Sequence, residues 1–314
     1  MAPDPGSTVI TPHRDVIVDI AEPSSHAVNV HLVSRVRPVM TPIDPPPSLR
    51  SEHPLLPLSS VVHQADTSAA KVLRMLDAFA GPQASLGVTE IALKVGVPKS
   101  TAHRILRSLV ESQYVRNVGN RYYLASRVFE LGQHLGSCRP NGLRDRAMPF
   151  LADLYAETRE TVHLAVLDGV DILYLEKLFG PASVRSGTAV GARRRAHATA
   201  LGKAMLAFSA GDAVEKALTT RMDRYTQYTQ VSPRGLEIML NRTREQGFAT
   251  DQEESLLGMA CIAAPIRAPH SGHAVAAVSV SVRTSSGALN RYSSKVIKTA
   301  NGIARHLGPA AFGT

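Results

Sequence analysis

Residues 85–123 read SLGVTEIALKVGVPKSTAHRILRSLVESQYVRNVGNRYY, and this stretch decides the fold of the first structured part of the chain. Apolar residues at Ala102, Leu106 and Leu109 recur at the spacing of a buried helical stripe. A shorter helix before them ends at Gly96, and the segment VGVPKS supplies the turn between the two helices. The spacing predicts a helix-turn-helix, in which the second helix recognises DNA.

The face of this second helix opposite the apolar stripe is polar and holds no carboxylate before Glu111. Base edges in the major groove accept hydrogen bonds from such side chains, whereas DNA phosphates repel carboxylates. We expect five residues to face the major groove: Ser100, Thr101, His103, Arg104 and Arg107. Lys99, at the start of the helix, is expected to contact phosphate. The alternative interpretation is an ordinary solvated helix face.

A hairpin is predicted over residues 113–124, closed by the turn-rich NVGN at 117–120. Arg116 and Arg121 would lie on this wing and contact phosphate. An amphipathic helix over residues 68–79 would complete a three-helix core. Winged helices also dock proteins, so an adaptor that does not bind DNA remains an alternative.

The composition favours an anionic partner and argues against several classes of protein. The 314 residues carry a formal net charge of +9, and residues 67–138 hold nine Lys or Arg against four acidic residues. The two cysteines, Cys138 and Cys261, lie far apart, so no disulfide framework or metal site is readable. No apolar run reaches the ~20 residues of a membrane helix, and the first residues do not resemble an export signal. We therefore expect a cytoplasmic protein without a cofactor or membrane contact.

The chain divides into four segments. Residues 1–66 contain eleven of the twenty prolines and are predicted to be a disordered tail, unless translation begins downstream, for example at Met40. Residues 67–124 are the predicted winged helix-turn-helix domain. Residues 125–142 are a predicted linker helix and hinge, whose helix packs on its own domain or carries a dimer contact. Residues 143–309 are the predicted second domain.

The second domain reads as antiparallel strands with grouped helices, which is an α+β fold. Strands are predicted at residues 161–167, 172–178, 259–266 and 274–282, and helices at 143–159, 200–208, 234–247 and 288–307. In the last strand Ser279 and Ser281 alternate with three valines, so two hydroxyl groups share one side of the sheet. We expect these hydroxyl groups to line a cavity.

Four motifs resemble the IclR family of bacterial transcriptional regulators, and the similarity covers about residues 68–309. They are VPKSTAHRILRSLVE at 97–111, ETVHLAVLDG at 160–169, AHATALGKAMLAF at 196–208 and DQEESLLGMACIAAPIR at 251–267. The resemblance implies a winged helix-turn-helix, a linker helix used in dimerisation and a GAF-like effector domain that binds a small, often carboxylate-bearing metabolite. It also implies a homodimer or a dimer of dimers that is mostly a repressor and sometimes an activator.

The resemblance also implies where the effector binds. It points to Ala200 and Leu201, whose amide groups would lie at a helix start that suits an anion. It points as well to the following residues of the second domain: Asp251, Met259, Cys261, Ser279 and Ser281. Glu253 and Glu254 show no regular metal-ligand pattern and are expected to be solvated.

The chain departs from the family pattern at Arg193-Arg194-Arg195-Ala196, where members usually carry an apolar, proline-containing stretch. If Arg194 points inward, it could bind a second anionic group, which favours a dicarboxylate or an aromatic acid as effector. If it points outward, it is a solvated loop charge. We expect the outward orientation, because an unpaired buried guanidinium is costly.

His197 and Cys261 raise the alternative of a hydrolytic enzyme. Cys261 lies in an apolar strand, where a cysteine is usually a small buried hydrophobic residue, and no oxyanion motif accompanies it. We therefore expect no catalysis. The sequence predicts a sequence-specific regulator, more a repressor than an activator, whose affinity for double-stranded operator DNA is set by a small carboxylate-bearing metabolite. A dimer would require an operator with an inverted repeat.

Overall fold

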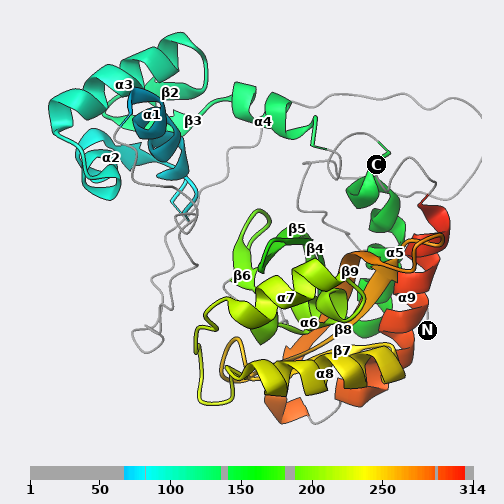
Figure 1. Ribbon diagram of the computed structural model, residues 1–314. Helices are drawn as coiled ribbons and strands as arrows, with labels where there is room; N and C mark the ends of the chain where they lie inside the picture. Colours follow the sequence, from blue (N-terminus) through cyan, green and yellow to red (C-terminus); the bar gives the residue numbers. More distant parts are fainter. Residues whose placement is uncertain (1–66, 82, 136–140, 181–187, 287–288, 308–314) are drawn as a thin grey trace, which may run out of the picture. The chain divides into compact units, whose positions relative to one another are not determined.

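The computed structural model describes residues 67–81, 83–135, 141–180, 188–286 and 289–307 (Figure 1). The predicted tail at 1–66 and most of the predicted hinge, residues 136–140, lie outside these ranges. Within them, no helix is long and apolar enough to cross a membrane.

The first structured part contains three helices and a small sheet, which confirms the winged helix-turn-helix fold. The helices are α1 (Ser68–Asp77), α2 (Val88–Val95) and α3 (Lys99–Glu111), and the antiparallel strands β1 (Leu86–Gly87), β3 (Arg121–Leu124) and β2 (Val115–Val118) lie in that order. As predicted, α2 ends at Gly96, whose φ of 72° is in the left-handed region that glycine tolerates.

One apolar core holds this part together. Met75 of α1, Leu86 of β1, Ile91 of α2 and Leu106 of α3 are all fully buried in it. The hairpin turn is tighter than predicted, because Val118 already pairs with Arg121. The helix-turn-helix is therefore a packed unit in which the outer face of α3 is exposed to solvent.

The linker helix α4 (Ser126–Gly132) is shorter than the predicted helix and buries none of its residues. Two of its apolar side chains, Phe129 and Leu131, are 67% and 48% exposed. Leu135, just beyond the helix, is 56% exposed. Of the two interpretations of this helix, packing on its own domain does not account for these side chains.

The second structured part is built on a six-stranded sheet in which every neighbouring pair is antiparallel. The strands, in sheet order, are β6 (Arg193–Arg195), β5 (Asp171–Leu178), β4 (Thr161–Asp168), β9 (Ala274–Arg283), β8 (Met259–Arg267) and β7 (Ala249–Gln252). Helices α5 (Leu143–Thr158) and α9 (Ser293–His306) cover one face, and α6 (Ala200–Ala207), α7 (Gly211–Thr219) and α8 (Pro233–Gln246) lie on the other (Figure 1). The predicted α+β class is confirmed.

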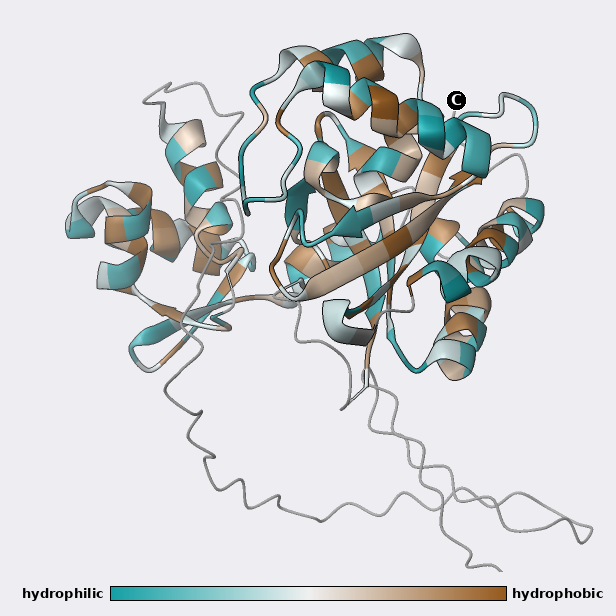
Figure 2. Cartoon of the chain, turned by 90° about the horizontal axis from the view of Figure 1, so that it is seen from below, coloured by the Kyte–Doolittle hydropathy of each residue, from teal (hydrophilic) through white to brown (hydrophobic). Residues whose placement is uncertain are grey.

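The sheet separates two apolar cores. Figure 2 shows its strands largely in hydrophobic colours between the two groups of helices. Val278, Val280 and Val282 of β9 face α5 and α9, whereas Ala277 on the same strand faces α6. The alternation predicted for β9 therefore holds, and Ser279 and Ser281 lie on the α6 side.

Three elements of this part were not predicted from the sequence: β6, β7 and α7. β6 consists of three arginines and shows no apolar alternation, and β7 has only four residues. The closing helix α9 also begins later than expected, at Ser293, after a short 3-10 turn over Leu289–Tyr292. β6 matters most, because it fixes the direction of Arg194.

Candidate functional site

The outer face of α3 presents polar side chains to solvent. Lys99, Ser100, His103, Arg104 and Arg107 are exposed and Thr101 is partly exposed, whereas the apolar stripe of the same helix is buried. Arg107 is held by Glu111 one turn further on, with 3.0 Å between Nε and Oε1. The structure therefore brings the predicted base-reading residues onto one accessible surface.

The two wing arginines differ in their surroundings. Arg116 is exposed, and its guanidinium lies 4.7 Å from the ring centroid of Tyr123. Arg121 donates to the side chain and carbonyl oxygens of Ser85 at 2.8 and 2.7 Å, and its guanidinium lies 3.4 Å from the Glu90 carboxylate. Arg121 thus ties the wing to the start of α2, and its predicted phosphate contact would compete with these bonds.

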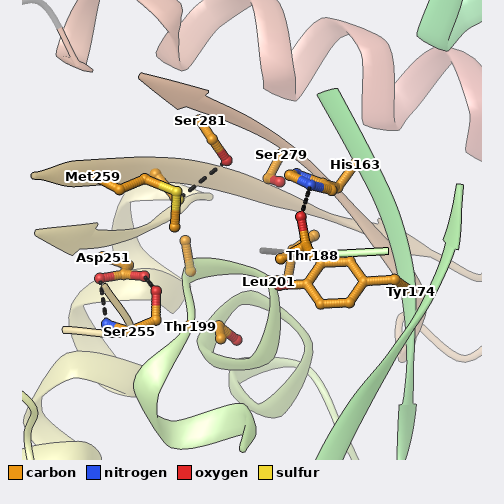
Figure 3. Close-up of a pocket in the computed structure, with 12 residues that line it drawn as sticks. His163, Tyr174, Thr188, Thr199, Leu201, Asp251, Ser255, Met259, Ser279 and Ser281 are labelled. Atoms are coloured by element: carbon orange, nitrogen blue, oxygen red, sulfur yellow. Dashed lines mark hydrogen bonds between the residues drawn. The ribbon is translucent and has the colours of Figure 1, made fainter. Parts of the chain in front are cut away.

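A cavity of about 10 Å³ lies between α6 and the sheet (Figure 3). Seven residues predicted for effector binding line it: Ala200, Leu201, Asp251, Met259, Cys261, Ser279 and Ser281. Five further lining residues were missed by the sequence analysis: His163, Tyr174, Thr188, Thr199 and Ser255. The volume is that of about one water molecule.

The first turn of α6 supplies donors to this pocket. The hydroxyl of Thr199 accepts a hydrogen bond from the amide of Gly202 at 2.9 Å and so caps the helix. The amide groups of Ala200 and Leu201 have no hydrogen-bond partner among the described residues. Both point from the positive end of a helix dipole, where a carboxylate is stabilised.

Gly202 explains how this helix start can lie so close to the preceding turn. A Cβ atom at this position would come within 2.2 Å of the carbonyl oxygen of Ala196. Only glycine allows this approach, which sets the position of the two amide groups.

His163 of β4 is a neutral member of the pocket wall. Burial lowers its pKa to about 3, and the charge of Lys177 acts in the same direction. Its Nε2 atom lies 2.9 Å from the Thr188 hydroxyl oxygen. The pairing of His163 with Ser279 across β4 and β9 puts both on one face, and knowing this register would have revealed the histidine.

Asp251 forms the opposite wall of the pocket. Its carboxylate accepts a hydrogen bond from the Ser255 hydroxyl at 2.6 Å (Figure 3) and another from the Glu254 amide at 2.7 Å. Burial raises its pKa to about 6, while the nearby ammonium group of Lys203 opposes this shift. Asp251 therefore holds the turn that follows β7 and titrates close to neutral pH.

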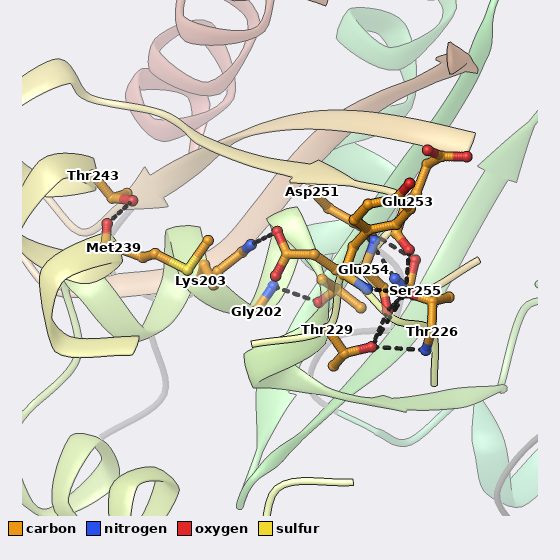
Figure 4. Close-up of polar contacts among 12 residues, drawn as sticks. Gly202, Lys203, Thr226, Thr229, Met239, Thr243, Asp251, Glu253, Glu254 and Ser255 are labelled. Atoms are coloured by element: carbon orange, nitrogen blue, oxygen red, sulfur yellow. Dashed lines mark hydrogen bonds and ion pairs between the residues drawn. The ribbon is translucent and has the colours of Figure 1, made fainter. Parts of the chain in front are cut away.

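Behind this wall lies a buried ion pair that the sequence did not predict. Lys203 of α6 donates to Oε1 of Glu254 at 2.5 Å, and both side chains are nearly inaccessible (Figure 4). The other oxygen of Glu254 has no hydrogen-bond partner among the described residues. The expectation that Glu254 is solvated was wrong, because Thr226 and Thr229 hold its backbone inward.

Cys261 and His197 are not brought together. Cys261 lines the pocket with its Sγ atom 3.1 Å from the Ser281 hydroxyl oxygen, and burial raises the pKa of its thiol, which keeps it protonated. His197 lies 3.0 Å from the carbonyl oxygen of Asp223 and lines a different cavity. The described residues thus offer no nucleophile and base pair at these two positions.

The expected outward orientation of Arg194 was wrong. Pairing of β6 with β5 sets Arg194 opposite Ile172, which belongs to the core beneath α6, and Arg194 is only 6% exposed. The neighbouring Arg193 and Arg195 form ion pairs with Asp168 and Asp171. Arg194 does not line the cavity itself.

Two family models match the chain. The model for the C-terminal part of the bacterial transcriptional regulator IclR matches residues 138–305, and the model for the IclR helix-turn-helix domain matches residues 68–119.

Characterised relatives and a solved structure agree with these models. The chain is 34% identical over 223 residues to the HTH-type transcriptional regulator XynR of Escherichia coli, covering 69% of this chain and 86% of XynR. It is 30% identical over 272 residues to the transcriptional repressor IclR of E. coli, covering 83% and 97%. An IclR homologue from Microbacterium hydrocarbonoxydans, solved in complex with 4-hydroxybenzoate, aligns with a TM-score of 0.70 at 26% identity, covering 77% and 99%.

Proposed function

Because this chain belongs to the IclR family of bacterial transcriptional regulators, we propose that it represses transcription from an operator that it grips through α3 and the wing, and that a small carboxylate releases it. The solvent-facing side chains of α3, above all Arg104, would read base edges. Lys99 and Arg116 would contact phosphates. The E. coli relative that is a repressor supports the sign of regulation.

One observation carries the effector part of this proposal. The amide groups of Ala200 and Leu201 have no partner among the described residues, and they border a buried pocket that also contains the hydroxyl group of Ser279. Such donors complement a carboxylate and would otherwise stay unsatisfied. The 4-hydroxybenzoate complex of the homologous protein supports a carboxylate as the ligand class.

The exposed side chains of α4 support a dimer. An apolar cluster on a seven-residue helix that buries none of its residues in the described part of the chain is costly to leave in water. A second copy of α4 would cover Phe129 and Leu131, and two copies of α3 would then meet an inverted repeat.

The DNA-binding part is tested by fluorescence anisotropy with labelled DNA from the region upstream of the protein's own gene. We expect binding that falls steeply with salt concentration, because phosphate contacts release counterions. Binding that is insensitive to salt, or absent for every upstream fragment, would favour a protein-docking adaptor.

The effector part is tested with a panel of small carboxylates that includes 4-hydroxybenzoate. We expect at least one to weaken operator binding and to raise the melting temperature of the protein. Ala200→Pro removes one of the two amide donors at the first helical position, where proline is tolerated, and should abolish the response. Ala200→Gly keeps the amide and serves as the matched control. An unchanged response in Ala200→Pro would contradict this site.

A further inference from the structure

Arg194 is a buried cation that has no counter-ion in the part of the chain that the structure describes. Its side chain is 94% buried, and no carboxylate of a described residue lies within ion-pair distance of it. Its two neighbours on β6 both have acidic partners. A guanidinium group that is taken out of water without hydrogen bonds to its donors costs free energy, which a bound anion would offset.

Arg194 contacts Tyr225, a side chain that also lacks a hydrogen-bond partner among the described residues. The guanidinium carbon of Arg194 lies 5.7 Å from the ring centroid of Tyr225, in a cation–π contact. The hydroxyl group of Tyr225 is buried and has no hydrogen-bond partner among the described residues. Burial raises the pKa of this phenol to about 12, so it stays a hydrogen-bond donor. A buried unpaired hydroxyl group and a cation without an acidic partner among the described residues therefore lie at one place.

This place adjoins the effector pocket on two sides. On the sheet, Arg194 pairs with Ile172, so Tyr174 of the pocket is its diagonal neighbour on the same face of β5. Burial raises the pKa of the Tyr174 phenol, and the positive charge of Arg194 acts on the same phenol in the opposite direction.

The second connection runs through the loop that carries Tyr225. Thr226, the next residue, donates to the carbonyl oxygen of Glu253 at 2.6 Å, and Thr229 donates to that of Glu254 at 2.6 Å (Figure 4). The turn they hold ends in Ser255, which lines the pocket opposite Tyr174. Arg194 and Tyr225 are thus connected to residues on both walls of the pocket.

We infer that the effector is a dianion, with one carboxylate at the amide groups of Ala200 and Leu201 and a second acidic group at Arg194 and Tyr225. This inference rests on the proposed effector site and specifies its ligand class. Arginine binds a carboxylate through two parallel hydrogen bonds, and the tyrosine hydroxyl adds a third donor. A monocarboxylate would fill only the α6 end and leave the far end unpaired.

The test compares matched ligands by isothermal titration calorimetry on the full chain. The probes are the α,ω-dicarboxylates from succinate to adipate and isophthalate, each paired with its monocarboxylate of equal length. At least one dicarboxylate should bind about tenfold or more tightly than its partner, which is the strength of one hydrogen bond to a charged group.

Arg194→Gln should remove this preference and leave the affinity for the monocarboxylate unchanged. Arg193→Gln, which removes one charge from the same strand on its other face, is the control and should keep the preference. Tyr225→Phe deletes a buried hydroxyl that has no described partner, so it should fold even if the arginine variant does not, and it should weaken only the dicarboxylate.

The outcomes separate the two proposals. If monocarboxylates bind in a way that depends on Ala200 but no dicarboxylate binds more tightly, the dianion is refuted and the effector site stands. A preference for the dicarboxylate that survives in both Arg194→Gln and Tyr225→Phe also refutes it. If no carboxylate of either kind binds, the effector site itself fails.

Discussion

At the scale of single residues, variants of Arg104 and Arg116 can distinguish a base contact from a phosphate contact. Arg104 lies in the middle of the exposed face of α3 and has no acidic partner among the described side chains. Arg104→Ala should cost about 1–3 kcal/mol on the operator and relax specificity at one base position. Competition titrations against operators with single base changes measure this loss.

Arg116→Ala is the matched comparison. It should weaken operator and random DNA alike and flatten the salt dependence of binding. Arg121 is a poor choice for this purpose, because its bonds to Ser85 and Glu90 also stabilise the domain. Equal losses on operator and random DNA for Arg104→Ala would argue against a base contact.

Asp251 should make effector binding depend on pH. Burial raises its pKa to about 6, so its ionised form would repel a bound carboxylate and its protonated form could donate to one. The affinity for a carboxylate probe that stays ionised should therefore rise as the pH falls through about 6. Calorimetric titrations across this range measure the slope, and Asp251→Asn should make it flat.

The same shift has a consequence for stability. The folded-state pKa lies above the unfolded value, so the stability tied to this proton is fully present below about pH 4 and is lost as the pH rises through about 6. Asp251→Asn should remove this component from urea unfolding measured in that window. A pH profile that is identical in the two proteins would contradict the assigned titration.

At the scale of elements, α4 buries none of its residues in the described part of the chain and exposes the apolar side chains of Phe129 and Leu131. Phe129→Glu places a charge in the apolar cluster and should convert the proposed dimer to a monomer, with a large loss of operator affinity because the two half-sites would no longer be bound together. Analytical ultracentrifugation measures the change in mass. Arg127→Glu, on the same helix but outside the apolar cluster, should remain dimeric, and a dimer that persists in Phe129→Glu would exclude α4 as the interface.

Elements with a strong local pattern could be predicted, and those defined by distant pairing could not. The buried stripe of α3 and the alternation that puts Ser279 and Ser281 on one side of β9 follow from spacing alone. The other five predicted pocket residues came only from the resemblance to the IclR family: Ala200, Leu201, Asp251, Met259 and Cys261. β6 exists because β5 pairs with it, and nothing within three arginines encodes that pairing. The direction of Arg194 was wrong for the same reason, and His163 was missed because its register with Ser279 joins strands far apart in the chain.

At the scale of the whole molecule, regulation requires that the effector bind two arrangements of the protein unequally, because equal affinity shifts no equilibrium. We expect small-angle scattering of the dimer to change when a saturating carboxylate is added. The change should be absent in Ala200→Pro and retained in Ala200→Gly. Identical scattering with and without the effector, under conditions in which it releases DNA, would count against a change in dimer geometry.

The small volume of the pocket between α6 and the sheet also bears on the rate of ligand binding. If the proposed effector binds here, a cavity of about 10 Å³ must widen before a carboxylate fits. In stopped-flow mixing, the observed rate of binding should then reach a plateau as the ligand concentration rises, and the plateau is the opening rate. The response through this regulator could then be no faster than the opening of the pocket, even at a saturating effector concentration.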